Sequence, residues 1–282
     1  MKKSLLKRIF VFFIGISVAA SFTACGTSKS SAAGGASEKK ELKLGVSPGP
    51  YNDLFNAGVK PILEKEGYKV TLVNFSNLLQ SEVALTEGSI DFNVAQHNAY
   101  AKSFNKEKNA NIVSIIKIPT VRAGIFSNKY KSLKDVKDGA KVLIPQDPSN
   151  AARAYSLLQK AGWIKLTPGV DPTLASKKDI AENSHNLNIV AIDSAQIPAT
   201  MNETDFAVIP GSIVYMAKMD ANKSLISETL VPDLYITVVV NGPNKNAKWA
   251  KDIVNAYKSS EFKKYLKTHN KNGYWVLPDD LK

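Results

Sequence analysis

The 282-residue chain has one cysteine and three histidines, and only two arginines beyond residue 24. A single cysteine excludes an internal disulfide framework. The histidines lack H-x-H or H-E-x-x-H spacing, so no zinc site is predicted. No G-x-S-x-G, P-loop or G-x-G-x-x-G motif is present, and nothing in the sequence requires an enzyme. Hydrophobic residues form 44% and charged residues 22%, ordinary globular values that exclude disorder and collagen-like repeats.

The net charge of +12 falls to +8 when Lys2, Lys3, Lys7 and Arg8 are removed with an N-terminal signal. The mature chain would then begin at Cys25 and have 258 residues. Its lysines are spread over amphipathic faces without interleaved aromatic residues. This distribution argues against nucleic acid as a partner.

The N-terminal residues have the pattern of a secretory signal. The apolar run 9–20 would rise about 18 Å as a helix, well short of the roughly 30 Å hydrocarbon core. The following Phe-Thr-Ala-Cys-Gly, with Cys25 fourth, resembles a bacterial lipobox, which implies diacylglycerol on the Cys25 sulfur. We therefore predict a signal peptide over 1–24, a flexible tether over 25–40 and a lipid-anchored protein on the extracytoplasmic face of the cell membrane. An ordinary signal peptide with an incidental cysteine is the alternative.

From Glu41 onward, short apolar runs alternate with amphipathic stretches. Strands are predicted at 42–46, 70–75, 112–118, 141–144, 187–192, 206–209 and 235–240. Helices are predicted at 54–63 with a kink at Pro61, at 151–161, at 212–219 and as a pair within 249–266. This alternation favours parallel sheets covered by helices. The 242 residues from 41 to 282 are more than a single hydrophobic core usually serves, so we expect two α/β domains. Ligands bind beyond the carboxyl ends of such strands, so we expect the two domains to face a cleft.

The turn after the strand 141–144 is the first candidate site. Ser149 or Asn150 is expected to cap the next helix, which places Arg153 in its first turn. A cation there opposes the helix dipole by about 0.3–1 kcal/mol, and a bound anion would reverse the penalty. Arg122 and Arg153 stand among 31 lysines in the mature chain, and only arginine offers a planar fork for a carboxylate. The alternative for each is a surface arginine paired with an acid on a neighbouring turn.

A second candidate site follows a short strand that ends near Val94. Asn98 is expected to cap the helix that continues towards residue 104. Gln96, His97 and Tyr100 would then offer amide, imidazole and phenol groups at the mouth of the strand. A purely structural hydrogen-bonding role for His97 is the alternative.

Several motifs, in order along the chain, resemble the NlpA/MetQ family of substrate-binding lipoproteins of methionine ABC importers. They are Gly-Val-Ser-Pro-Gly-Pro at 45–50, Gln96-His97 with Tyr100, Phe-Asn-Lys at 104–106, Lys-Tyr-Lys-Ser-Leu at 129–133, Ile-Pro-Gln-Asp-Pro-Ser-Asn at 144–150 with Arg153, and Leu-Gln-Lys-Ala-Gly at 158–162. The resemblance implies a two-lobed periplasmic-binding-protein-like α/β fold of type II, with two crossing segments and the ligand between the lobes. The lobes would be 41–121 plus 238–282, and 122–237.

The resemblance also implies roles for matching residues. Arg153 would bind the carboxylate of an amino acid, and Asn150 would support the polar end of the ligand. His97 and Tyr100 would line the cleft, with Gln96 beside them. The implied partners are a small-molecule ligand, a permease and an ATPase, with no cofactor and no metal.

The chain departs from the family pattern around the expected ligand. Ala95 and Leu78 stand where the family has aromatic residues, and Pro210, Gly211 and Ser212 interrupt a familiar A-V-I-N-x-N-Y run. Arg122 and Ala123 replace a Pro-Met pair. Each lost hydrogen-bond partner costs about 1–3 kcal/mol. We therefore expect a ligand larger than methionine or differently charged, such as a short peptide, cystine or a derivative with a second anion for Arg122.

Two other classes of function remain as alternatives. A surface lipoprotein with an adhesion or envelope role would keep only a vestigial cleft, and the lost site asparagines favour this reading. A cleft enzyme would need a nucleophile–base pair or a metal site, and the sequence contains neither pattern.

Overall fold

The computed structural model describes residues 38–282, apart from the Asn272 side chain. The predicted signal peptide, Cys25 and residues 25–37 of the tether lie outside the described residues. Within the described part of the chain, no helix is long and apolar enough to cross a membrane.

The first sheet has five strands in the order β2-β1-β3-β12-β4. Its strands are β1 (Glu41–Val46), β2 (Lys69–Asn74), β3 (Phe92–His97), β4 (Ile112–Lys117) and β12 (Ile236–Asn241). β1 pairs in parallel with β2 and β3, whereas β12 runs antiparallel to β3 and β4. The prediction of parallel sheets is therefore wrong for β12, because this strand enters the sheet from a distant part of the chain.

The second sheet has five strands in the order β11-β5-β10-β6-β9. Its strands are β5 (Gly124–Phe126), β6 (Lys141–Pro145), β9 (Asn188–Ile192), β10 (Phe206–Ile209) and β11 (Ile226–Ser227), and a separate hairpin pairs β7 (Ile164–Leu166) with β8 (Ile180–Asn183). β6 lies parallel to β9 and β10, whereas β5 runs antiparallel to β10 and β11. The seven predicted strand ranges agree with the observed strands to within one residue at each end, and 206–209 agrees at both ends. The strand expected to end near Val94 continues to His97 as β3.

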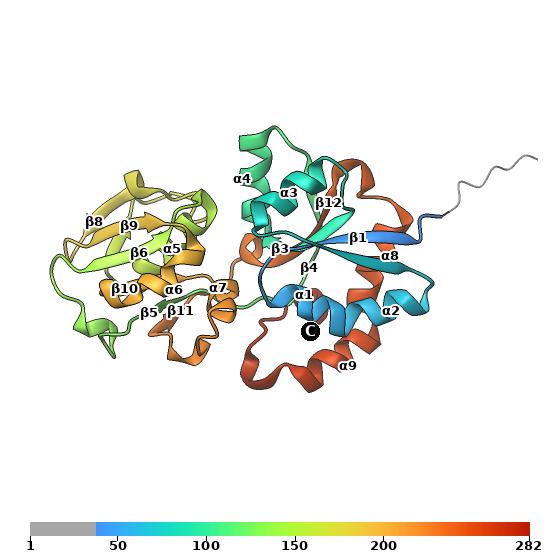
Figure 1. The fold of residues 1–282 in the computed structure, drawn as a ribbon. Helices are drawn as coiled ribbons and strands as arrows, with labels where there is room; N and C mark the ends of the chain where they lie inside the picture. Colours follow the sequence, from blue (N-terminus) through green and yellow to red (C-terminus); the bar gives the residue numbers. More distant parts are fainter. Residues whose placement is uncertain (1–37) are drawn as a thin grey trace, which may run out of the picture. The chain divides into compact units, whose positions relative to one another are not determined.

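Each sheet has its own helices (Figure 1). Each also has its own apolar core. The first carries α1 (Pro50–Leu54), α2 (Lys60–Lys65), α3 (Leu78–Thr86), α4 (Asn98–Lys108), α8 (Lys248–Lys258) and α9 (Ser260–His269), and the second carries α5 (Pro148–Lys160), α6 (Ile197–Thr200) and α7 (Gly211–Met216). A π-helical turn at Phe55–Val59 joins α1 to α2. The irregularity expected at Pro61 therefore comes before the proline, as an extra residue in the turn.

The chain passes between the two sheets twice, through residues 118–123 and 228–235. These crossing segments are bonded to each other: the Ala123 N–H donates to Glu228 Oε1 at 2.6 Å, and the Glu228 N–H donates to the Ala123 carbonyl at 3.0 Å. Two sheets with two crossings confirm the predicted fold class. The lobe bounds stay a prediction, although β12 already belongs to the first sheet from Ile236.

Candidate functional site

Helix α5 begins earlier than its sequence pattern predicted. Asp147 is the N-cap, its side chain accepts the Asn150 N–H at 3.0 Å, and Pro148 occupies the first helical position, where a missing N–H costs nothing. Capping by Ser149 or Asn150 is therefore wrong. Arg153 is the sixth helical residue and lies in the second turn, so the argument from the helix dipole does not apply to it.

Arg153 is instead held by an acid that the sequence analysis did not identify. Its Nε and Nη2 donate to the two carboxylate oxygens of Glu228 in a fork. The two residues are 5% and 6% exposed, so this is a buried ion pair on the second crossing segment. Desolvation alone would lower the pKa of Arg153, but the Glu228 carboxylate outweighs it and the pKa is raised. The interpretation of Arg153 as a surface arginine is excluded by its burial.

His97 ends β3 and caps α4, a position predicted for Asn98. Its Nδ1 accepts the Tyr100 N–H at 3.1 Å, so Nε2 carries the proton and donates it to Asn150 Oδ1 at 3.2 Å. Burial, with a smaller contribution from the Arg153 charge, lowers the pKa of His97 to about 3. Arg153 Nη1 also donates to Asn150 Oδ1, at 3.4 Å. The neutral imidazole of His97 and the guanidinium of Arg153 thus both donate to the amide oxygen of Asn150. His97 belongs to the first sheet, and the other two residues lie on α5 beside the second.

These side chains line a small cavity of about 60 Å³, here called the inner cavity. Nine of the ten residues proposed from the sequence line it: Leu78, Ala95, Gln96, His97, Tyr100, Asn150, Arg153, Pro210 and Ser212. The sequence analysis missed Tyr51, Gly211 and Ile236. Tyr51 follows the turn at the carboxyl end of β1. Gln96 was proposed because it lies at the carboxyl end of a strand, and the same reasoning could have identified Tyr51. The backbone leaves no room for a side chain at Gly211, because a Cβ there would lie 2.6 Å from the Arg122 carbonyl oxygen.

One donor in the inner cavity has no partner. Gln96 is 1% exposed, and its Nε2 makes no hydrogen bond within residues 38–282. A buried N–H without an acceptor costs about 1–3 kcal/mol, so such a group marks a place where an acceptor is expected. The Arg153 and Glu228 charges cancel and His97 is neutral. The inner cavity is therefore polar but carries no net charge.

The inner cavity adjoins a larger one of about 350 Å³, here called the outer cavity. The two share Leu78, Ala95, Tyr100, Asn150, Pro210 and Ser212. The outer cavity lies between the start of α3, the turn before α5, the turn after β9 and helix α7.

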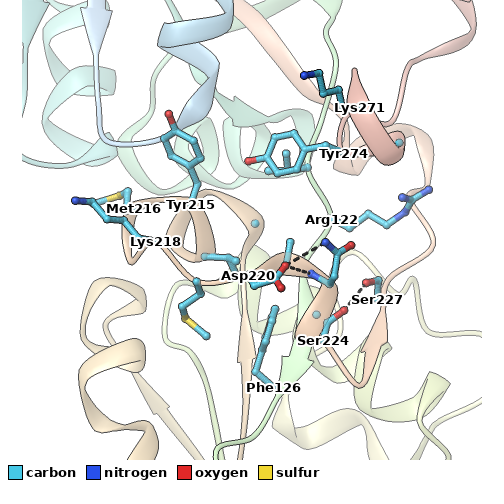
Figure 2. Close-up of a pocket in the computed structure, with 18 residues that line it drawn as sticks. Arg122, Phe126, Tyr215, Met216, Lys218, Asp220, Ser224, Ser227, Lys271 and Tyr274 are labelled. Atoms are coloured by element: carbon cyan, nitrogen blue, oxygen red, sulfur yellow. Dashed lines mark hydrogen bonds between the residues drawn. The ribbon is translucent and has the colours of Figure 1, made fainter. Parts of the chain in front are cut away.

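Arg122 lies elsewhere. It is exposed and lines a different cavity, of about 760 Å³, between α7, β11 and residues 271, 273 and 274. Figure 2 shows its guanidinium pointing away from Asp220, whose carboxylate accepts hydrogen bonds from Asn222. It does not line the cavity that Arg153 lines, so the structure gives no support for placing it on the same ligand. No group of three or more acidic, histidine or cysteine side chains able to hold a metal occurs among the described residues.

Comparison with known proteins identifies relatives along most of the chain. The NlpA lipoprotein family model matches residues 42–277. "D-methionine-binding lipoprotein MetQ" of Salmonella typhi is 33% identical over 79% of this chain and 83% of its own. "Probable D-methionine-binding lipoprotein MetQ" of Haemophilus influenzae is 31% identical over 95% of this chain and 97% of its own. The structure of a nutrient binding protein from Burkholderia cenocepacia bound to methionine is 35% identical, with a TM-score of 0.77 over 84% of this chain and 99% of that one.

Proposed function

Because the chain belongs to the NlpA lipoprotein family, we propose that it is the extracytoplasmic solute-binding lipoprotein of an ABC importer and delivers a small zwitterion to a permease and its ATPase. The relatives named above are binding proteins, and the proposed role is binding and release without a chemical step. A lipid on Cys25 would hold the protein at the membrane.

One observation carries this proposal: the buried Arg153 guanidinium and the buried Gln96 side chain, whose Nε2 has no partner among the described residues, line the same cavity between two sheets. Arg153 uses Nε and Nη2 on Glu228, which leaves one N–H of Nη2 and one of Nη1 unassigned. These two N–H groups can bind a carboxylate end-on, and Gln96 Nε2 can add a third donor. Asn150 would orient the guanidinium, while Leu78, Ala95, Pro210 and Ser212 would form the wall.

Thermal unfolding and calorimetry of the full lipidated chain in detergent test the proposal. A panel of amino acids and small peptides is titrated, and a true ligand at 100 times its Kd adds about 2.7 kcal/mol to the free energy of unfolding. The variant Arg153→Gln/Glu228→Gln removes both charges of the buried pair and should abolish the shift. Arg122→Gln, at the other arginine, is the matched control and should retain it.

A protein with an adhesion or envelope role and a vestigial cleft would give no shift with any member of the panel. A shift that survives in the Arg153→Gln/Glu228→Gln protein would mean that the ligand binds outside the inner cavity. Either result contradicts the proposal.

A further inference from the structure

Two buried polar side chains beneath helix α3 have no hydrogen-bond partner. Glu82 on α3 and Asn93 on β3 are both 0% exposed. Neither oxygen of the Glu82 carboxyl group and neither polar atom of the Asn93 amide has a partner within residues 38–282. An ionised acid without a counter-ion is among the most costly groups in a protein interior, so this arrangement requires an explanation.

The two side chains lie close together. Helix α3 packs on β1 and β3, and Ser81 Oγ is 2.5 Å from the point that a Cβ of Gly45 would occupy. Gly45 is the register partner of Asn93 in the neighbouring strand. Asn93 therefore lies under the same turn of α3, and its amide is close enough to Glu82 to lower the pKa of that acid against the larger effect of burial.

One proton would satisfy all four polar atoms. A protonated carboxyl group offers one O–H donor and one carbonyl acceptor, and a primary amide offers an N–H donor and a carbonyl acceptor. Placed face to face, the two groups form a ring of two hydrogen bonds that carries no charge. Burial raises the pKa of Glu82 to about 8, so the acid keeps its proton at neutral pH.

The charged groups around α3 do not control this proton. The titratable side chains on α3 and on the elements packed against it are Glu41 and Lys43 on β1, Asp91 and His97 at the two ends of β3, Glu87 at the end of α3, and Tyr100, Lys102, Lys106, Glu107 and Lys108 on α4, with none on β12. None of these described side chains contributes to the pKa of Glu82, which burial and the Asn93 amide determine. Burial and the nearby Glu82 raise the pKa of Tyr100, so this phenol lies beside the acid and stays neutral.

The pair lies directly behind the wall of the inner cavity. Leu78 is one helical turn before Glu82, on the same face of α3. Ala95 is two residues after Asn93, on the same face of β3. Leu78, Ala95 and Tyr100 line both the inner and the outer cavity. A shift of α3 against β3 would therefore move groups that contact a ligand.

From these features we infer that Glu82 is a positioning residue of the ligand site: its protonated carboxyl group forms a ring of two hydrogen bonds with the Asn93 amide and holds the start of α3 against β3. This inference rests on the proposed function and adds a pH dependence to it. When the proton leaves, the carboxylate has no O–H to donate and places an uncompensated charge in the interior. Helix α3 then moves to admit water, the cavity wall changes shape, and ligand binding weakens.

Infrared spectroscopy of the full chain in detergent tests the proton itself. The difference spectrum between pH 6.5 and 9.5 should contain the carbonyl stretch of one protonated carboxylic acid, lost at the higher pH, and Glu82→Gln should abolish this band. The glutamine amide can form the same two-bond ring without a proton that titrates. The α3 amides of the wild-type protein should therefore exchange with deuterium faster at pH 9 than those of Glu82→Gln.

Calorimetry with L-methionine as the probe tests the positioning role. The wild-type protein and Glu82→Gln should bind it within twofold of each other at pH 6.5. At pH 9 about nine-tenths of the free wild-type protein carries the ionised acid, and its Kd should be about fivefold or more above that of Glu82→Gln. The ligand ionises equally in both measurements, so the ratio reports the protein alone. Glu87→Gln changes an exposed acid at the end of the same helix, lines neither cavity and should follow the wild type as the matched control.

The possible failures are distinguishable. A difference spectrum without a band from Glu82, or a ratio of the two Kd values that is the same at both pH values, would overturn the inference while the proposed function stands. If no member of the amino-acid panel binds at either pH, the proposed function and the positioning role both fail, even where the infrared band shows a protonated Glu82.

Discussion

Replacing Glu228 with glutamine tests the structure at its most consequential contact. The substitution keeps the size of the side chain and one oxygen for the Ala123 N–H, but it puts an NH₂ group opposite an N–H of Arg153. Both residues are more than nine-tenths buried, so the guanidinium charge is left without its counter-ion in a poorly solvated place. Breaking a buried pair in this way costs about 3–5 kcal/mol. Since one of the two hydrogen bonds from Arg153 survives, we expect the free energy of unfolding to fall by about 3 kcal/mol, the lower end of this range.

Urea denaturation of the ligand-free protein, followed by tryptophan fluorescence, measures this loss. Glu203→Gln is the matched control, because Glu203 is exposed and has no ion pair among the described residues; it should change stability by less than about 0.5 kcal/mol. The double variant Arg153→Gln/Glu228→Gln should be more stable than Glu228→Gln alone, since no charge is then left unpaired. A loss below 1 kcal/mol for Glu228→Gln, or additive effects in the double variant, would refute the buried pair.

Three further expectations concern Glu82, His97 and Gly211. Glu82 on α3 is fully buried, and burial raises its pKa to about 8. The folded protein therefore holds a proton that the unfolded chain has released, and stability falls as pH rises from about 4.5 to 8; Glu82→Gln should remove that slope in denaturation curves at pH 5 and 8.5. His97, with a pKa of about 3, stays neutral above pH 5. The Kd of the zwitterion that binds in the inner cavity should therefore differ less than twofold between pH 5.5 and 8 in calorimetry, and a tenfold loss at the lower pH would show that His97 titrates. Gly211→Ala forces a methyl group against the first crossing segment and should cost about 1–3 kcal/mol in urea, whereas no loss would contradict the close approach.

Local patterns in the sequence predicted the strands well and their directions less well. The run 206–209 is buried throughout and flanked by turn residues, so both of its ends could be predicted. Whether β12 runs parallel or antiparallel to β3 depends on where the chain returns after its second crossing, and no local pattern encodes that. The start of α5 could have been predicted, because Asp147-Pro148 supplies a cap followed by proline at the first helical position.

Only one partner of the ion pair between Arg153 and Glu228 could be predicted from the sequence. The rarity of arginine and its position after a strand directed attention to Arg153. Its partner lies 75 residues away in a stretch without periodicity, so nothing in the local sequence identifies Glu228. A general argument was still available: a buried guanidinium requires an acid, and its prediction should have prompted a search for one.

In the proposed transport cycle the binding protein releases its ligand each time, and it has to remain folded until the next ligand binds. The Glu228 carboxylate neutralises the buried Arg153 guanidinium from within the chain, so the interior does not depend on a ligand carboxylate to balance that charge. The same carboxylate holds the Ala123 backbone of the first crossing segment. A ligand carboxylate that weakens the hydrogen bonds between Arg153 and Glu228 would therefore act on both crossing segments, because Glu228 belongs to the second and bonds the first. Ligand binding would then be coupled to the connection between the lobes through this one side chain.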